Sequence, residues 1–163
     1  GTRRQLLSRI FSGITLSLAG LGLTLILLSP GLERLAYLSF STLFEEGVIY
    51  LTNPIRKRIE EQDWEGLAEL CKENGKLAEK LLQPMVFWSE GNAGDSDQEW
   101  AAALIAITKR ADGGVLALRD AAVKEDAEAA AAAYASIKLA AKDYVRTVNP
   151  KVQNDLPPLS EIK

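Results

Sequence analysis

Few side chains in this sequence could do chemistry. Among its 163 residues there is no histidine and a single cysteine, Cys71. Histidine is the commonest general base and metal ligand, and a lone thiol without a basic partner is not activated as a nucleophile. One cysteine also excludes an intrachain disulfide, a cysteine-rich zinc site and haem attachment through CxxCH. We therefore expect no catalytic residue, no metal site and no cofactor, and we predict that Cys71 is a buried free thiol.

Adjacent carboxylates are the remaining candidates for acid–base chemistry or calcium binding. They occur at Glu45-Glu46, Glu60-Glu61 and Glu125-Asp126. None of these pairs lies in a recognisable ligand loop, and Asp95-Ser96-Asp97 lacks the glycine and distal glutamate of an EF-hand. We expect all of them to be solvated helix faces or helix caps.

The charge balance argues against nucleic acid as a partner. The chain has 19 basic and 22 acidic side chains and a net charge of −3, whereas proteins that bind nucleic acid usually carry a basic surface. One dense basic cluster stands out, formed by Arg56, Lys57 and Arg58. We interpret it as a contact for lipid headgroups or an acidic partner, and an ordinary solvated helix turn explains it equally well.

An uncharged segment near the N-terminus predicts a membrane anchor. Residues 10–32 contain no charged side chain. A helix of about 20 apolar residues spans the hydrocarbon core of a bilayer. Pro30 ends the helix, because proline cannot continue the backbone hydrogen bonds. Residues 1–31 are thus expected to form a basic N-terminus and one transmembrane helix, with a buried core helix as the alternative.

Basic residues before this segment predict its orientation. Arg3, Arg4 and Arg9 have no acidic neighbour, so the positive-inside rule places the N-terminus in the cytoplasm. The rest of the chain then lies on the periplasmic side of a bacterial inner membrane. Residues 2–7 resemble a twin-arginine export motif, and simple positive-inside arginines explain them equally well. Residues 29–31 match a signal-cleavage site poorly, so we expect an uncleaved signal anchor.

Small residues recur along the expected anchor: Gly13, Ser17, Ala19, Gly20 and Gly22. Small side chains let the backbones of two membrane helices approach closely. We therefore expect one face of the anchor to pack against a protein partner. Tolerance of glycine in lipid is the alternative.

The next segment, residues 32–53, is apolar but contains Glu45 and Glu46, which are costly inside a bilayer. We expect either a helix near the membrane surface or the first helix of the folded domain, with a re-entrant or second span as the alternative. Asn53-Pro54 is typical of a helix cap followed by the first helical residue. A new helix is therefore predicted to begin there.

Residues 54–149 show apolar residues at helical spacing and no sustained alternation with period two. This pattern predicts an all-α fold, an up-down bundle of three or four helices. Pro84 is predicted to end one helix, and residues 89–97 to form a loop. Gly113-Gly114 inside a predicted helix indicates close packing against another helix or a pigment, because each glycine costs a helix roughly 1 kcal/mol.

Helix caps and stops divide the second half of the bundle. Ser96 and Glu99 form a capping box, and Asp126 is placed to cap the last helix. Asn149-Pro150 stops that helix. Residues 150–163 are expected to be an extended tail that drapes on a partner.

Residues 87–146 resemble the C-terminal half of the cytochrome c′ family. Phe87-Trp88 precedes a loop, Trp100 opens a helix, and an alanine-rich helix ends with residues 138–146. The resemblance implies the four-helix bundle of that family.

The haem-attachment motif of that family is missing. Lys138 and Ala141 stand at the two cysteine positions, and Lys142 stands at the histidine position. No c-type haem is expected, and the resemblance implies a haem-less bundle retained for its shape.

These observations predict a non-catalytic, membrane-anchored accessory subunit that braces the periplasmic face of a larger membrane protein complex. Its partners would be the other subunits and the lipid bilayer. The resemblance implies a respiratory or photosynthetic electron-transfer assembly. The alternative is a membrane-anchored periplasmic bundle that binds or senses a ligand, although a sensor usually needs a cytoplasmic output domain that the residues before Ile10 are too few to form.

Overall fold

The structure is a computed structural model, and it describes residues 33–92, 97–152 and 156–163. These residues form helices joined by short turns, with no strand among them. The expected anchor, including Gly13, Ser17, Ala19, Gly20 and Gly22, lies outside the described residues. Within the described ranges, no helix has both the length and the apolar character needed to cross a membrane.

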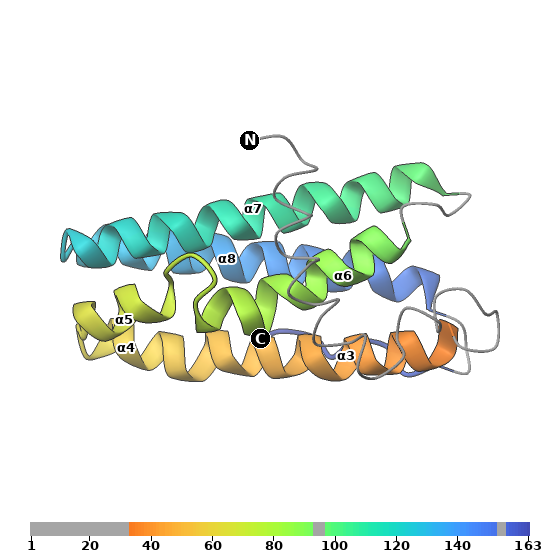
Figure 1. The fold of residues 1–163 in the computed structure, drawn as a ribbon, viewed down its shortest axis with the longest axis horizontal. Helices are drawn as coiled ribbons and strands as arrows, with labels where there is room; N and C mark the ends of the chain where they lie inside the picture. The colour runs from red at the N-terminus through yellow and green to blue at the C-terminus, as the bar shows by residue number, and fades with distance from the viewer. Residues whose placement is uncertain (1–32, 93–96, 153–155) are drawn as a thin grey trace.

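The helices lie side by side and alternate in direction along the chain (Figure 1). In chain order they are α3 (Glu33–Tyr50), π-helical η2 (Leu51–Ile55), α4 (Arg56–Glu60), α5 (Trp64–Leu70), π-helical η3 (Ala78–Leu82), α6 (Gln83–Gly91), α7 (Gln98–Val123), α8 (Ala127–Val148) and 3-10 helical η4 (Asn149–Lys151). The α3, η2 and α4 segments form one continuous helix, as do η3 and α6. The all-α prediction is confirmed.

Two prolines lie inside these continuous helices. Pro54 is within η2, and Pro84 stands at the start of α6, directly after η3. A proline has no N–H to donate to the carbonyl four residues earlier. In a π-helical turn a carbonyl accepts from the amide five residues later instead of four. The Leu51 carbonyl accepts from the Arg56 amide in this way. The predicted helix start at Asn53-Pro54 and the predicted helix end at Pro84 are therefore wrong, because the helix widens at each proline and continues.

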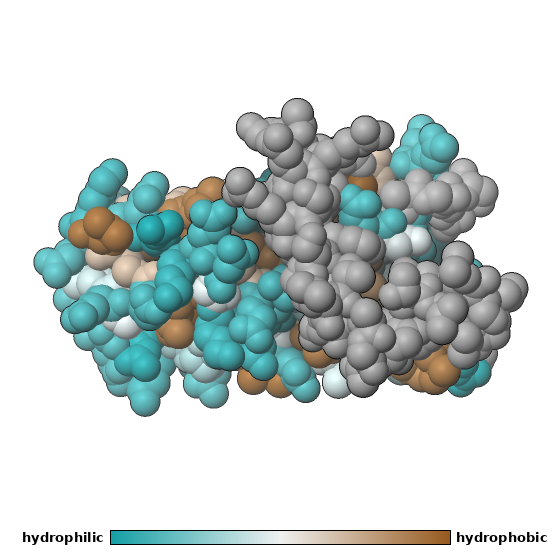
Figure 2. Space-filling model, in the orientation of Figure 1, coloured by the Kyte–Doolittle hydropathy of each residue, from teal (hydrophilic) through white to brown (hydrophobic). Residues whose placement is uncertain are grey.

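The α3 helix is part of the bundle. Its buried face consists of Ala36, Tyr37, Phe40, Phe44 and Gly47. Of the alternatives for residues 32–53, the structure therefore supports the first helix of the folded domain. The opposite face of α3 keeps apolar side chains exposed, and Figure 2 shows brown apolar atoms along the edge that α3 forms.

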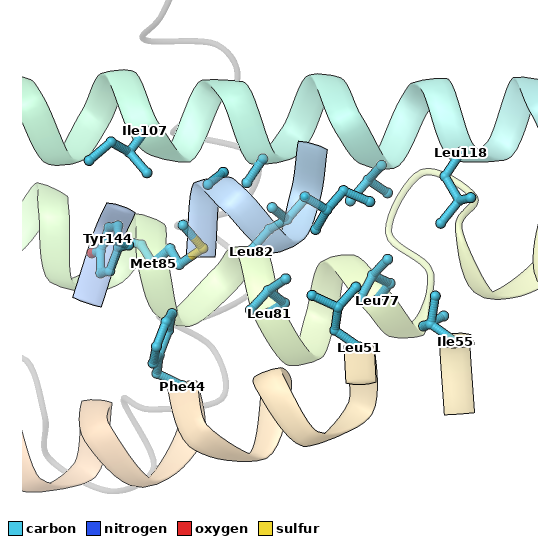
Figure 3. Packing of buried hydrophobic residues seen from close by; sticks show 14 of the residues in the cluster. Phe44, Leu51, Ile55, Leu77, Leu81, Leu82, Met85, Ile107, Leu118 and Tyr144 are labelled. Carbon is cyan, nitrogen blue, oxygen red and sulfur yellow. The ribbon is translucent and has the colours of Figure 1, made fainter. Parts of the chain in front are cut away.

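Side chains from every long helix meet in one continuous apolar core. Figure 3 shows Leu51 and Ile55 of the first helix facing Leu77 and Leu81 on the helix that contains η3. At Gly47 the two backbones themselves meet. A Cβ placed on Gly47 would lie 2.8 Å from the Leu81 Cα and closer still to the Lys80 carbonyl oxygen. Only glycine therefore fits at this crossing.

The α7 and α8 helices approach each other through Gly114. A Cβ there would lie 2.6 Å from the Ile137 Cγ1, whereas a Cβ on Gly113 would meet nothing within 4 Å. The prediction of close packing against another helix is confirmed for Gly114. Gly113 has no such role.

Aspartates cap three of the helices. The Asp126 carboxylate accepts from the Ala129 amide at 3.0 Å, as predicted. The Asp97 carboxylate accepts from the Trp100 amide at 3.0 Å, so Asp97 caps α7, and Ser96 of the predicted capping box lies outside the described residues. Asp63 caps α5 through the Gly66 amide. The predicted loop over residues 89–97 is shorter at its start, because α6 continues to Gly91.

Candidate functional site

The basic cluster predicted as a headgroup or partner contact lies in the exposed helix α4, directly after η2. Each of its three cations forms an ion pair with a nearby carboxylate. The pairs are Arg56–Glu60 at 3.4 Å, Lys57–Glu61 at 3.8 Å and Arg58–Asp63. Because the positive charges are compensated locally, this geometry favours a solvated helix turn over a dedicated anion-binding surface.

The remaining reactive groups have structural roles. The Cys71 thiol is buried, and burial raises its pKa to about 12, so it is a neutral thiol at physiological pH. The prediction of a buried free thiol is confirmed. Among the described ranges, no three potential ligands of the Cys, Asp and Glu types are close enough to hold a metal ion.

A cluster of hydroxyl groups lies inside the bundle, where α6, α7 and α8 meet. The Tyr144 hydroxyl donates to the Met85 carbonyl at 2.8 Å and lies 2.9 Å from the Ser89 Oγ. The Ser89 hydroxyl is also 2.6 Å from the same carbonyl and 3.4 Å from the Thr108 Oγ1. Thr108 in turn donates to the Leu104 carbonyl at 2.8 Å. Every hydroxyl of this cluster is therefore satisfied within the protein.

Burial raises the pKa of Tyr144 well above its usual value, so its hydroxyl stays protonated. No basic side chain takes part in the cluster's hydrogen bonds, so Ser89 has no general base. The cluster is a buried polar network that joins three helices.

An aromatic layer packs between this cluster and α3. Phe44 stacks on Tyr144 with ring centroids 5.5 Å apart, and Phe40 stacks on Trp88 at 4.9 Å. Tyr37 meets the edge of Trp88 at 5.4 Å. These contacts join α3, α6 and α8 through side chains, and Trp88 is partly buried and packs against the core of the bundle.

Sequence reasoning missed this cluster because it assigned Ser89 to a loop. Thr108 follows Leu104 by four residues and precedes Ala111 by three, which places its hydroxyl on the buried stripe of α7. That spacing was the available signal.

The C-terminal tail lies on the chain's own helices. The Asn149 side-chain amide donates to the Leu159 carbonyl at 3.0 Å and accepts from the Leu159 amide at 2.8 Å. The Tyr37 hydroxyl donates to the Pro157 carbonyl at 2.7 Å. In the described part of the tail, residues 156–163 form neither helix nor strand, whereas Pro150 and Lys151 belong to the 3-10 helix η4. The tail bridges α3 and the end of α8 within this chain, and the expectation that it drapes on a partner stays a prediction.

A hollow of about 350 Å³ lies beside the tail. Residues of α8, η4 and the tail itself form its walls: Lys142, Val145, Arg146, Asn149, Pro150, Glu161 and Ile162. We call this space the tail hollow. It combines two cationic side chains with one carboxylate at the protein surface.

No family model, curated protein or solved structure matches this chain. The resemblance to cytochrome c′ therefore stays a prediction. Of the residues on which that prediction depends, Ala141 is buried in α8, and Lys142 lines the tail hollow.

Proposed function

We propose that this protein is a non-catalytic, membrane-anchored accessory subunit of a larger membrane protein complex. Residues 10–32 supply the anchor, and the described bundle braces the periplasmic face of the complex at a bacterial inner membrane. One observation carries the proposal. The α3 helix, described from Glu33 onward, follows the uncharged segment in the sequence and keeps Leu35, Leu43 and Ile49 exposed on its outer face. Apolar side chains beside an anchor suit coverage by a neighbouring subunit.

The chemistry of the bundle supports a role based on shape. Cys71 is neutral and buried, and the Tyr144 hydroxyl is held inside a satisfied network. Three of the paired carboxylates have structural partners: Glu60 and Glu61 form ion pairs, and Asp126 caps α8. These groups stabilise the fold and leave no activated nucleophile among them.

The host complex is proposed from the resemblance to cytochrome c′. A haem-less bundle of that shape fits a respiratory or photosynthetic electron-transfer assembly. In such an assembly the subunit would stabilise its neighbours or dock a carrier without carrying electrons itself.

The alternative is an anchored periplasmic bundle that binds or senses a small ligand. Such a protein needs a cavity between its helices. Here the facing side chains form one continuous cluster, and the tail hollow lies at the surface between α8 and the tail. This geometry supports the alternative less well than the accessory role.

Gentle detergent extraction from the cells that make this protein, followed by native-size separation with visible absorption spectra, tests the proposal. We expect the chain to migrate with a large assembly and the purified chain to show no visible chromophore. Migration only as a small free species would overturn the accessory role.

Matched variants locate the contact within the same experiment. Replacing Leu35, Leu43 and Ile49 together with serine should release the chain from the assembly. Val123 is 68% exposed on α7, and Val123→Ser should leave the assembly intact. Equal behaviour of the two variants would show that the outer face of α3 is not the contact.

A further inference from the structure

We infer that the outer face of α7 is a contact between two copies of this chain, which pair with their α7 helices antiparallel. The contact residues repeat along α7 with the spacing of a coiled coil: Ala102, Ala106, Lys109, Gly113, Leu116, Asp120 and Val123. We call this set the α7 seam. The inference does not depend on the proposed accessory role, because it rests on α7 alone.

The α7 seam lies on the face of α7 that points away from the bundle. Its members follow one another at alternating steps of four and three residues, which places them on one stripe of the helix. All seven are exposed, Leu116 by 47% and Val123 by 68%. Figure 1 shows α7 on the side of the bundle opposite α3. A stripe of this spacing over three heptads is the pattern by which two helices pair.

Gly113 has no packing role within the bundle. A Cβ on Gly113 would meet nothing within 4 Å, although a glycine costs a helix roughly 1 kcal/mol relative to alanine. In a pair of helices such a position leaves a hole that a large side chain of the partner helix can enter. Leu116, which follows Gly113 by three residues, is an exposed side chain of the size that fills such a hole.

The α7 seam complements a second copy of itself when the two helices are antiparallel. A two-fold axis midway between Gly113 and Leu116 sets each Gly113 opposite Leu116 of the second copy. The same axis sets Lys109 opposite Asp120 of the second copy, twice in the dimer. In a parallel pair each Lys109 would instead face another Lys109, and each Asp120 another Asp120, and like charges repel. The charges of the seam therefore favour the antiparallel pair.

The charges of Lys109 and Asp120 are not compensated within the chain. Among the described residues, neither side chain forms an ion pair, whereas the neighbouring Arg110 pairs with Asp143 at 2.8 Å. Eleven residues of helix separate Lys109 from Asp120, which is about 16.5 Å along the axis. The two cannot reach each other within one α7 helix, so an ion pair between them requires a second copy.

Exchanging these two charges in the full chain tests the inference. Sedimentation equilibrium in density-matched detergent micelles measures the dissociation constant of the dimer. Lys109→Asp and Asp120→Lys should each weaken the dimer at least about tenfold, because each change places two pairs of like charges across the seam. The double variant Lys109→Asp/Asp120→Lys should return to within about threefold of the wild type, because both ion pairs form again with their charges exchanged.

A leucine variant tests the apolar part of the seam with its charges unchanged. Leu116→Ala should weaken the dimer at least about tenfold, since the symmetric contact loses two buried side chains. Leu139→Ala is the matched control and should not change the dissociation constant, because Leu139 is similarly exposed, by 50%, but lies on α8 outside the seam. Val123 is at the end of the seam, so Val123→Ser should leave the dimer formed.

A wild-type chain that stays monomeric up to about 100 μM would overturn the inference. Failure of the double charge variant to recover the lost affinity, or equal affinities of Leu116→Ala and Leu139→Ala, would overturn it as well. Far-UV circular dichroism checks the fold, and if a charge variant does not fold, the two leucine variants decide the outcome. Because the assay uses the purified chain, its failure leaves the accessory role standing.

Discussion

The two helix pairs of this bundle reach close contact by different means. The α7 and α8 helices are regular, and they approach where Gly114 leaves room for the Ile137 side chain. The α3 helix meets the η3–α6 helix main chain to main chain, where Gly47 faces the Lys80 carbonyl. A side chain can shift to relieve a new contact, but a carbonyl inside a helix cannot move without moving the helix. The first contact is adaptable, and the second is rigid.

The rigid pair also carries most of what could have a function. The exposed face of α3, the aromatic layer and two of the tail-binding side chains, Tyr37 and Glu45, belong to it. Its two π-helical turns are of a kind often found at functional sites. The α7–α8 pair serves chiefly as the support against which these features are held.

The largest expected effect is at the rigid contact. Gly47→Ala should destabilise the fold by at least about 3 kcal/mol, because the new Cβ would overlap main-chain atoms of Lys80 and Leu81. Chemical denaturation followed by circular dichroism measures the change. Wild-type stability in this variant would show that the two helices do not cross so closely.

A smaller effect is expected at the adaptable contact. Gly114→Ala should cost roughly 1 kcal/mol, because the Ile137 side chain must shift while alanine favours the helix. Gly113→Ala is the matched control and should stabilise the helix by roughly 0.5–1 kcal/mol, since nothing lies within 4 Å of its Cβ. If Gly114→Ala proves as costly as Gly47→Ala, the contrast between the two pairs is wrong.

The hydroxyl cluster, which links the two pairs, should give an effect of similar or slightly smaller size. Tyr144→Phe and Ser89→Ala should each cost about 1 kcal/mol, because each removes a buried hydrogen bond and leaves the Met85 carbonyl paired with the other hydroxyl. The double variant should cost at least the sum of the two, since it takes both hydroxyl donors from the Met85 carbonyl. A double variant that costs clearly less than the sum would show that the two hydroxyls do not both donate to that carbonyl. Tyr134→Phe, on the same helix, is the control and should change stability by less than about 0.5 kcal/mol.

The smallest effect concerns the cap of α7. Hydrogen bonds from Lys151 and from the Trp100 amide lower the pKa of Asp97 below its usual value. Between the two pKa values the unfolded chain therefore binds more protons than the folded chain does. Asp97 contributes to the stability of the fold above pH about 4, and this contribution is lost as the pH falls toward the lowered pKa. Asp97→Asn keeps a capping oxygen but does not titrate. In thermal melts between about pH 3 and 7, the melting temperature of Asp97→Asn should therefore fall less on acidification than that of the wild type. An unchanged pH profile would show that Asp97 does not contribute to the acid destabilisation.

The α7–α8 pair could be predicted from sequence because its signals are local. The Asp126 cap, the stop after Val148 and the buried stripes through Leu104 and Ile137 all follow from residues a few positions apart. The burial of Cys71 followed from the same helical spacing. The exposed or capping carboxylates were also predictable, since none lay in a ligand loop.

The α3–α6 pair could not be predicted in this way. Asn53-Pro54 has the composition of a helix start, and only packing against the rest of the bundle makes the helix continue through η2. The same error at Pro84 placed Ser89 in a loop and hid the hydroxyl cluster. The docking of the tail depends on Asn149 and Glu45, which are 104 positions apart by their numbers, and nothing local connects them.

Photo-crosslinking in intact membranes tests the central claim most directly. A photoreactive amino acid replaces Ile49, whose side chain is 61% exposed on the outer face of α3. The accessory role predicts a crosslink to one specific neighbouring protein, which co-migrates with the chain after native-size separation. Crosslinks to lipid alone, or none at all in cells that make the protein at its normal level, would contradict it.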